Sequence, residues 1–93
     1  MISQEDCIAL CGLERPEITA IAEHEHIPDT AAAALASCLL REPDGTKVIR
    51  QFLVENIEHA IEDNRLPHAT ELFHTLRRFI DHHPEAVEDP ISY

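Results

Sequence analysis

The residues best suited to chemistry lie in one short run, Ile21-Ala22-Glu23-His24-Glu25-His26-Ile27-Pro28. Carboxylates and imidazoles alternate within this run, and both are common metal ligands. In a continuous helix, His24 and His26 would point about 200° apart. Because a proline disfavours helical geometry at the preceding residue, Pro28 predicts a break there. Such a break can bring His26 toward Glu23 or His24, and we expect any metal site of this protein at this corner.

The candidate metal ligands are Glu23, His24 and His26, with His59 as a fourth ligand from a later helix or from a second chain. Two imidazoles and a carboxylate are compatible with zinc, iron or nickel. A divalent transition metal is therefore the cofactor that this sequence suggests. The alternative interpretation is a solvated, acidic helix face without any ligand.

Other histidines and glutamates follow weaker patterns. Seven histidines occur in 93 residues, and Glu71 with His74 forms a second Glu-x-x-His pair. That pair points about 150° away from the apolar stripe of its helix, which predicts a solvated face. Glu25 shares the apolar side of its helix with Ile18 and Ile21. A carboxylate in such a position lies at the edge of the helix, pairs with a buried cation or has a function, and of these we expect the pairing with a cation.

The candidate cations for Glu25 are Arg41 and Arg50. The pair His82 and His83 precedes Pro84, where a helix should end. Protonated imidazoles are favoured near the negative end of the helix dipole, and a surface metal site is the alternative.

Three cysteines, Cys7, Cys11 and Cys38, have no Cys-x-x-Cys spacing. An odd number without that spacing does not indicate a disulfide framework. Cys7 and Cys11 share a helix face, either as small buried side chains or as a two-thiolate metal clip. Reduced thiols suit the cytoplasm, and the sequence begins without the basic segment of a signal peptide. We therefore expect a cytoplasmic protein.

The chain is strongly acidic, with 18 Asp and Glu against seven Lys and Arg and a net charge of −11. Such a charge disfavours binding to nucleic acid or to anionic lipid. It fits a partner of basic surfaces, a cation binder or simply a solvated surface. The longest apolar run, Ala31–Ala36, is far too short to cross a membrane.

The elements that must position these residues are helices. A short helix is expected up to Cys11, followed by helices near 14–26 and 28–41, by one that begins between 43 and 47 and ends at 63, and by one near 67–82. The helix near 28–41 is rich in alanine, and its small side chains allow a neighbouring helix to approach closely. The last two are joined by three or four residues and form an antiparallel hairpin. The fold class is all-α, with four to five short helices and the hairpin packed on the Ala-rich central helix.

The predicted core follows from the apolar stripes of these helices. It consists of Ile18, Ile21, Leu35, Leu39, Ile49, Phe52, Leu53, Ile57, Ile61, Leu72, Phe73, Leu76, Phe79 and Ile80. We expect one helical domain over residues 1–84 and an acidic tail over 85–93. A chain this short can leave an apolar strip of its hairpin uncovered, which favours a homodimer.

The segment from Leu13 to Pro28 resembles one found in short all-helical bacterial proteins of unassigned function, and the similarity extends into the helical hairpin. The resemblance implies helical architecture and brings no activity with it.

Catalytic patterns are not visible in the sequence. It contains no Gly-x-Ser-x-Gly element, no glycine-rich phosphate loop and no fixed cysteine–histidine pattern. We therefore expect a non-catalytic interaction or accessory module that binds an unidentified protein or itself. The alternative is a protein that binds a divalent metal through the Glu-His-Glu-His helix break. A third hypothesis is a mimic of nucleic-acid charge that occupies a basic groove on another protein.

Overall fold

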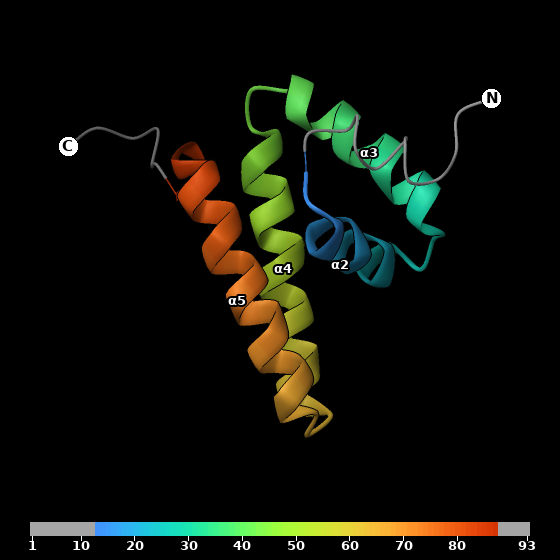
Figure 1. Cartoon of the computed structure of the whole chain (residues 1–93), viewed down its shortest axis with the longest axis vertical. Coiled ribbons are helices and arrows are strands. Elements are labelled where there is room, and N and C mark those ends of the chain that lie inside the picture. Colours follow the sequence, from blue (N-terminus) through green and yellow to red (C-terminus); the bar gives the residue numbers. More distant parts are fainter. Residues whose placement is uncertain (1–12, 88–93) are drawn as a thin grey trace.

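The computed structural model describes residues 13–87, which fold into four α-helices and one 3₁₀ helix (Figure 1). Their bounds are α2 Arg15–Glu25, α3 Asp29–Arg41, α4 Gly45–Glu62, α5 Leu66–His82 and η1 Pro84–Val87. Between residues 13 and 87 no strand occurs, and the predicted all-α class is confirmed. The helix expected up to Cys11 lies outside the described residues. None of the described helices is long and apolar enough to cross a membrane.

The hairpin of α4 and α5 forms the long axis of the molecule, and α2 and α3 lie beside α4 (Figure 1). The expected contact between the hairpin and the Ala-rich helix is made by α4 against α3. The helix in contact with all the other described elements is α4, which touches α2, α3, α5 and η1. The central position thus belongs to α4 rather than to the Ala-rich α3. The alanines of α3 bring its backbone close to its neighbours, whereas the longer α4 carries buried residues along its whole length.

Local sequence explains where the helices begin and end. The backbone N–H of Glu14 donates a 3.3 Å hydrogen bond to Oε1 of Glu17, and Pro16 occupies the first turn of α2. After α2, His26 adopts the left-handed conformation, with φ of 57°. The break predicted from Pro28 is therefore confirmed. Asn64, directly after the C-cap residue Asp63 of α4, also has a left-handed φ of 58°.

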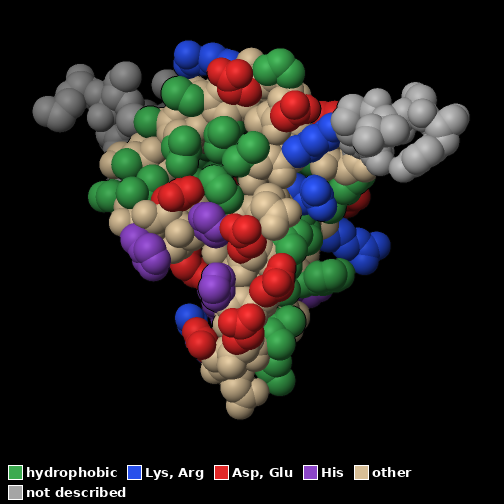
Figure 2. Space-filling view, turned by 180° about the vertical axis from the view of Figure 1, so that it is seen from behind, with side chains coloured by type: hydrophobic (Ala, Val, Ile, Leu, Met, Phe, Trp, Pro, Cys, Tyr) green, Lys and Arg blue, Asp and Glu red, His purple; other side chains and the backbone are tan. Residues whose placement is uncertain are grey.

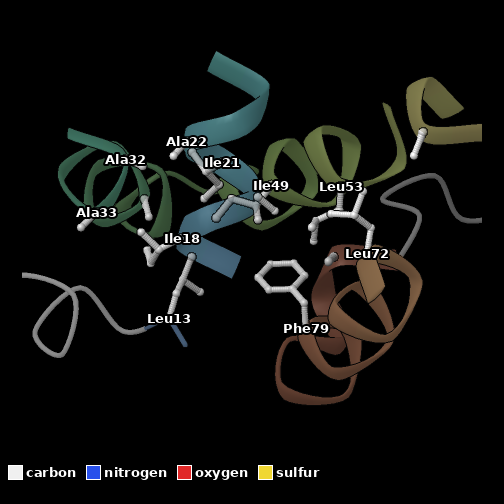
Figure 3. Packing of buried hydrophobic residues seen from close by; sticks show 14 of the residues in the cluster. Leu13, Ile18, Ile21, Ala22, Ala32, Ala33, Ile49, Leu53, Leu72 and Phe79 are labelled. Atoms are coloured by element: carbon white, nitrogen blue, oxygen red, sulfur yellow. The ribbon is translucent and has the colours of Figure 1, made fainter. Parts of the chain in front are cut away.

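The core lies where α2, α3, α4 and α5 meet (Figure 3). The largest fully buried side chains are Ile18, Ile21, Ile49, Leu53 and Phe79, all predicted core residues. Two of the predicted core residues are on the surface instead, since the side chains of Ile61 and Phe73 are 55% and 53% exposed. The reason is that α2 and α3 cover only one side of the hairpin.

Alanines account for most of the buried residues that the predicted core did not include. They are Ala20, Ala22, Ala32, Ala33, Ala36, Ala60, Ala69 and Ala86. Ala86 belongs to η1, which packs against α4 and α5. Residues 85–87, assigned to the tail from the sequence, are thus part of the packed structure, and 88–93 lie outside the described residues.

Candidate functional site

The four predicted metal ligands point to different partners. Glu23 reaches across to α5, where its Oε1 lies 2.8 Å from Nε2 of His68. His26 is exposed at the end of α2. His59 is also exposed, and its nearest acidic partner is Glu62 at 4.0 Å. Within residues 13–87, no three His, Cys, Asp or Glu side chains are grouped closely enough to hold a metal ion. The structure therefore does not bring the predicted set together.

The fourth predicted ligand, His24, instead joins α2 to α4. Its Nε2 lies 2.6 Å from Oε1 of Glu55, and its ring stacks on Phe52 at 4.2 Å between centroids. The other carboxylate oxygen of Glu55 accepts a 3.2 Å hydrogen bond from Gln51. The hydrogen bond from His24 is the main cause that lowers the pKa of Glu55 below its usual 4.5. This arrangement makes His24 a tether between helices.

Glu25 is exposed, and its closest charged partner is Nδ1 of His24 at 3.5 Å. The predicted pairing with Arg41 or Arg50 is therefore wrong. The apolar stripe of α2 ends before this residue, because the helix terminates at Glu25 and the chain turns at His26.

The buried carboxyl group of α2 belongs to Glu17, which is only 3% exposed. Its Oε1 accepts the capping hydrogen bond from Glu14, whereas Oε2 is shielded from solvent and has no hydrogen-bond partner among the described residues. Burial is the main cause that raises the pKa of Glu17. Sequence reasoning missed this residue. A signal was available, since Glu17 lies four residues from both Leu13 and Ile21 and so shares their buried face.

A groove between α2 and α5 passes beside Glu17. It consists of two adjoining chambers of about 380 and 260 Å³, and Pro16, Glu71 and Thr75 line both. Glu17 and His74 line the larger chamber only. We call this feature the α2–α5 groove. Glu71 and His74 are exposed, as their spacing predicted, but their face of α5 is a wall of this groove rather than open surface.

Ion pairs border the α2–α5 groove and connect its two helices. Arg78 lies 2.9 Å from Glu14, and His82 lies 3.6 Å from the same carboxylate. At the other end, His68 contacts Glu23 at 2.8 Å and Glu71 at 3.9 Å. Histidine and acidic side chains also gather on the face shown in Figure 2. Contacts between imidazoles and carboxylates thus recur wherever α2 meets the hairpin.

The remaining histidines and cysteines have separate surroundings. His83 stacks on the buried Phe79 with 4.8 Å between ring centroids, and it lies 3.5 Å from Glu85. Cys38 is exposed and carries a free thiol. Cys7 and Cys11 lie outside the described residues, so the metal-clip hypothesis stays a prediction.

The side of the hairpin that α2 and α3 leave uncovered is apolar. Ile61, Leu66 and Phe73 are each more than half exposed, at 55%, 56% and 53%. Leu66, Phe73 and Ile80 recur at intervals of seven residues and therefore share one face of α5. A shallow hollow of about 170 Å³ lies there between Phe73, Leu76, Arg77, Ile80 and Asp81. We call the surface formed by Ile61, Leu66, Phe73, Leu76 and Ile80 the outer hairpin face.

Comparison of the chain with protein-family models, with curated proteins and with solved structures gave no match. The resemblance of residues 13–28 to short helical bacterial proteins therefore stays a prediction.

Proposed function

We propose that this chain is a small non-catalytic interaction module that pairs with a second copy of itself through the outer hairpin face. The observation that carries the proposal is the exposure of Leu66 and Phe73, which share one face of α5, and of Ile61 on the neighbouring α4. Large apolar side chains that lie together on a helix face are more typical of a contact surface than of a surface exposed to water. A second hairpin offers the same spacing, so that four helices can bury their apolar stripes together.

The charges beside the outer hairpin face support a copy of the same chain as the occupant. A two-fold interface places the same surface on both partners, so it needs cations and anions side by side. Arg77 and Asp81 line the same hollow. Arg77 has no ion-pair partner among residues 13–87. Its guanidinium group can therefore meet an acidic side chain of the partner.

Local cations matter because the whole chain carries a net charge of −11. Two such chains repel each other at long range, and contact is least unfavourable where arginines interrupt the acidic surface. The cytoplasm as the compartment belongs to the same proposal. It is supported by the free, exposed thiol of Cys38, since such thiols persist where the surroundings are reducing.

Sedimentation velocity over a concentration series up to the high micromolar range tests this proposal. The wild-type chain should sediment as a dimer that dissociates on dilution. Replacement of both Ile61 and Phe73 by serine should give a monomer with an unchanged helical circular dichroism spectrum. Val48→Ser is the matched control, because Val48 is 37% exposed but lies elsewhere on α4. It should leave the dimer intact.

Two results would overturn the proposal. One is a wild-type chain that stays monomeric at every concentration. The other is a double variant that pairs as strongly as the wild type, since the dimer would then use another surface.

A further inference from the structure

The α2–α5 groove is separate from the outer hairpin face, and pairing of two chains does not involve it. Its two chambers run along α2 and are lined by carboxylates and by apolar groups. Pro16 lines both chambers, and Ala20 and Leu72 line the smaller one. The groove therefore combines an apolar surface with carboxylates at its border, and this combination suits an elongated ligand with a charged end.

One carboxyl oxygen in this groove lacks the partner that a buried polar atom requires. Glu17 lines the larger chamber, is 3% exposed, and has Oε2 without a hydrogen bond among the described residues. An unsatisfied buried oxygen is unfavourable, because it has lost its hydrogen bonds to water without gaining others. A ligand that donates a hydrogen bond to Oε2 removes this penalty. The ligand must therefore carry an N–H or O–H donor.

Among ligands with an N–H or O–H donor, the charges around the groove favour one that is a cation. Of its carboxylates, Glu14 is neutralised by Arg78 at 2.9 Å, and Glu23 meets His68 at 2.8 Å. Among the described residues, the one ion-pair partner of Glu71 is His68 at 3.9 Å. Arg15, which lines the smaller chamber, is engaged with Asp29 of α3 at 3.6 Å. The larger chamber thus keeps an excess of negative charge at Glu17 and Glu71.

We propose that the α2–α5 groove binds an aliphatic primary amine, whose ammonium group donates hydrogen bonds to Glu17 and Glu71 and whose hydrocarbon chain lies along Pro16 and Leu72. An ammonium group supplies three donors and one positive charge. The hydrocarbon chain of a short amine covers apolar surface without the need for further polar groups. A carboxylate or an alcohol of the same length lacks the positive charge.

Binding of an amine is coupled to a proton. Burial raises the pKa of Glu17. The backbone hydrogen bond from Glu14 opposes this rise, as do His83 and His82 at the end of α5, whereas the negative charge of Glu14 adds to it. Arg78, Glu71 and His74 complete the charged surroundings of the chamber. An aliphatic amine stays protonated below about pH 10. It therefore favours the ionised form of Glu17, so binding releases a proton and strengthens as the pH rises through the titration of Glu17.

Titration calorimetry with hexylamine tests the inference, at pH 5, 6 and 7 and in two buffers of different ionisation enthalpy. The wild-type chain should bind one equivalent, and the apparent enthalpy should depend on the buffer at the pH where Glu17 titrates. Glu17→Gln should weaken binding about tenfold or more and abolish the buffer dependence. The Glu17→Gln variant should still fold, because glutamine can take the place of glutamate in a capping box. Hexanoate and hexanol should not bind.

Glu58→Gln is the matched control, since Glu58 is an exposed glutamate on α4 outside the groove. It changes the net charge by the same amount and should leave hexylamine binding unaltered. Three results would overturn the inference. They are no saturable binding of hexylamine, equal weakening by Glu17→Gln and Glu58→Gln, and unchanged binding in Glu17→Gln.

Discussion

His24 of α2 and Glu55 of α4 are 31 positions apart in the sequence, and their side chains meet at 2.6 Å between Nε2 and Oε1. The imidazole is also held against Phe52 by ring stacking. Within the run of alternating glutamates and histidines, His24 therefore has a structural role. It attaches the end of α2 to the hairpin just before the chain turns at His26.

This contact predicts a specific loss of stability in acid. The pKa of Glu55 is lowered, mainly by the hydrogen bond from His24. A carboxylate with a lowered folded-state pKa contributes stability above its unfolded pKa, here about 4.5, and loses it as the pH falls through the folded value. Glu55→Gln should therefore lower the urea midpoint at pH 6 and have a smaller effect at pH 3.5. Urea denaturation at both pH values measures the difference.

Glu58→Gln provides the comparison for this measurement, because Glu58 is an exposed glutamate on α4, three residues beyond Glu55. Its urea midpoint should change little at either pH. An equal effect of the two substitutions at pH 6 would mean that general charge, and not the contact with His24, is responsible.

Glu17 should affect stability with the opposite sign. Burial raises the pKa of Glu17. Its contribution to stability is therefore fully present below about pH 4.5, the unfolded value, and is lost as the pH rises through the folded value. Glu17→Gln removes this loss, so the variant should have a higher urea midpoint than the wild type at pH 7 and a similar midpoint at pH 4. A variant that is less stable than the wild type at pH 7 would contradict the assignment of burial as the dominant effect.

The buried side chain of Asn56 should be required for the attachment of α2. Its Nδ2 donates a 2.8 Å hydrogen bond to the carbonyl of Ala20, and the residue is 4% exposed. Asn56→Ala removes the donor and leaves a small void, which should lower the free energy of unfolding by about 1–3 kcal/mol. Thr70→Ala is a suitable control, since the hydroxyl of Thr70 is exposed and bonds within its own helix. That control should change the free energy of unfolding by less than about 0.5 kcal/mol.

Much of the fold was predictable because its signals are local. Pro28 predicts the break after α2, and Asn64 predicts the end of α4, since each acts through its own backbone geometry. The buried positions of Ile18, Ile21 and Phe79 follow from helical periodicity alone. These inferences need no knowledge of how the helices are arranged.

The site was less predictable because it depends on which faces of the helices meet. Periodicity places Phe73 on an apolar stripe, but only the packing of α2 and α3 on one side of the hairpin decides that Phe73 stays exposed. Glu23 and His68 are brought together by the contact between α2 and α5, and no spacing in the sequence links them. Glu25 is a different case, since it follows the apolar stripe of α2 but is exposed because the helix ends there.

Acid should also promote self-association. A proton on each of the seven histidines would change the formal net charge from −11 to −4. Lower repulsion between chains should strengthen pairing as the pH falls from about 7.5 to 5.5. Light scattering over this range measures the change, with the double replacement of Ile61 and Phe73 by serine as the control. A wild-type signal that is flat across the range would contradict the prediction.

The turn after α2 should become more stable when His26 is replaced by glycine. His26 has φ of 57°, a left-handed conformation that costs a residue with a side chain about 1–2 kcal/mol. Glycine adopts the left-handed conformation without this cost, but it also increases the conformational entropy of the unfolded chain, which offsets part of the stabilisation. His26→Gly should therefore raise the free energy of unfolding by about 0.5–1 kcal/mol. His59→Gly is the control, because His59 is an exposed histidine inside α4, where glycine should lower the free energy of unfolding by about 1 kcal/mol. Thermal or urea denaturation of both variants decides the matter, and a destabilised His26→Gly would show that the imidazole makes a contribution larger than the strain of its backbone.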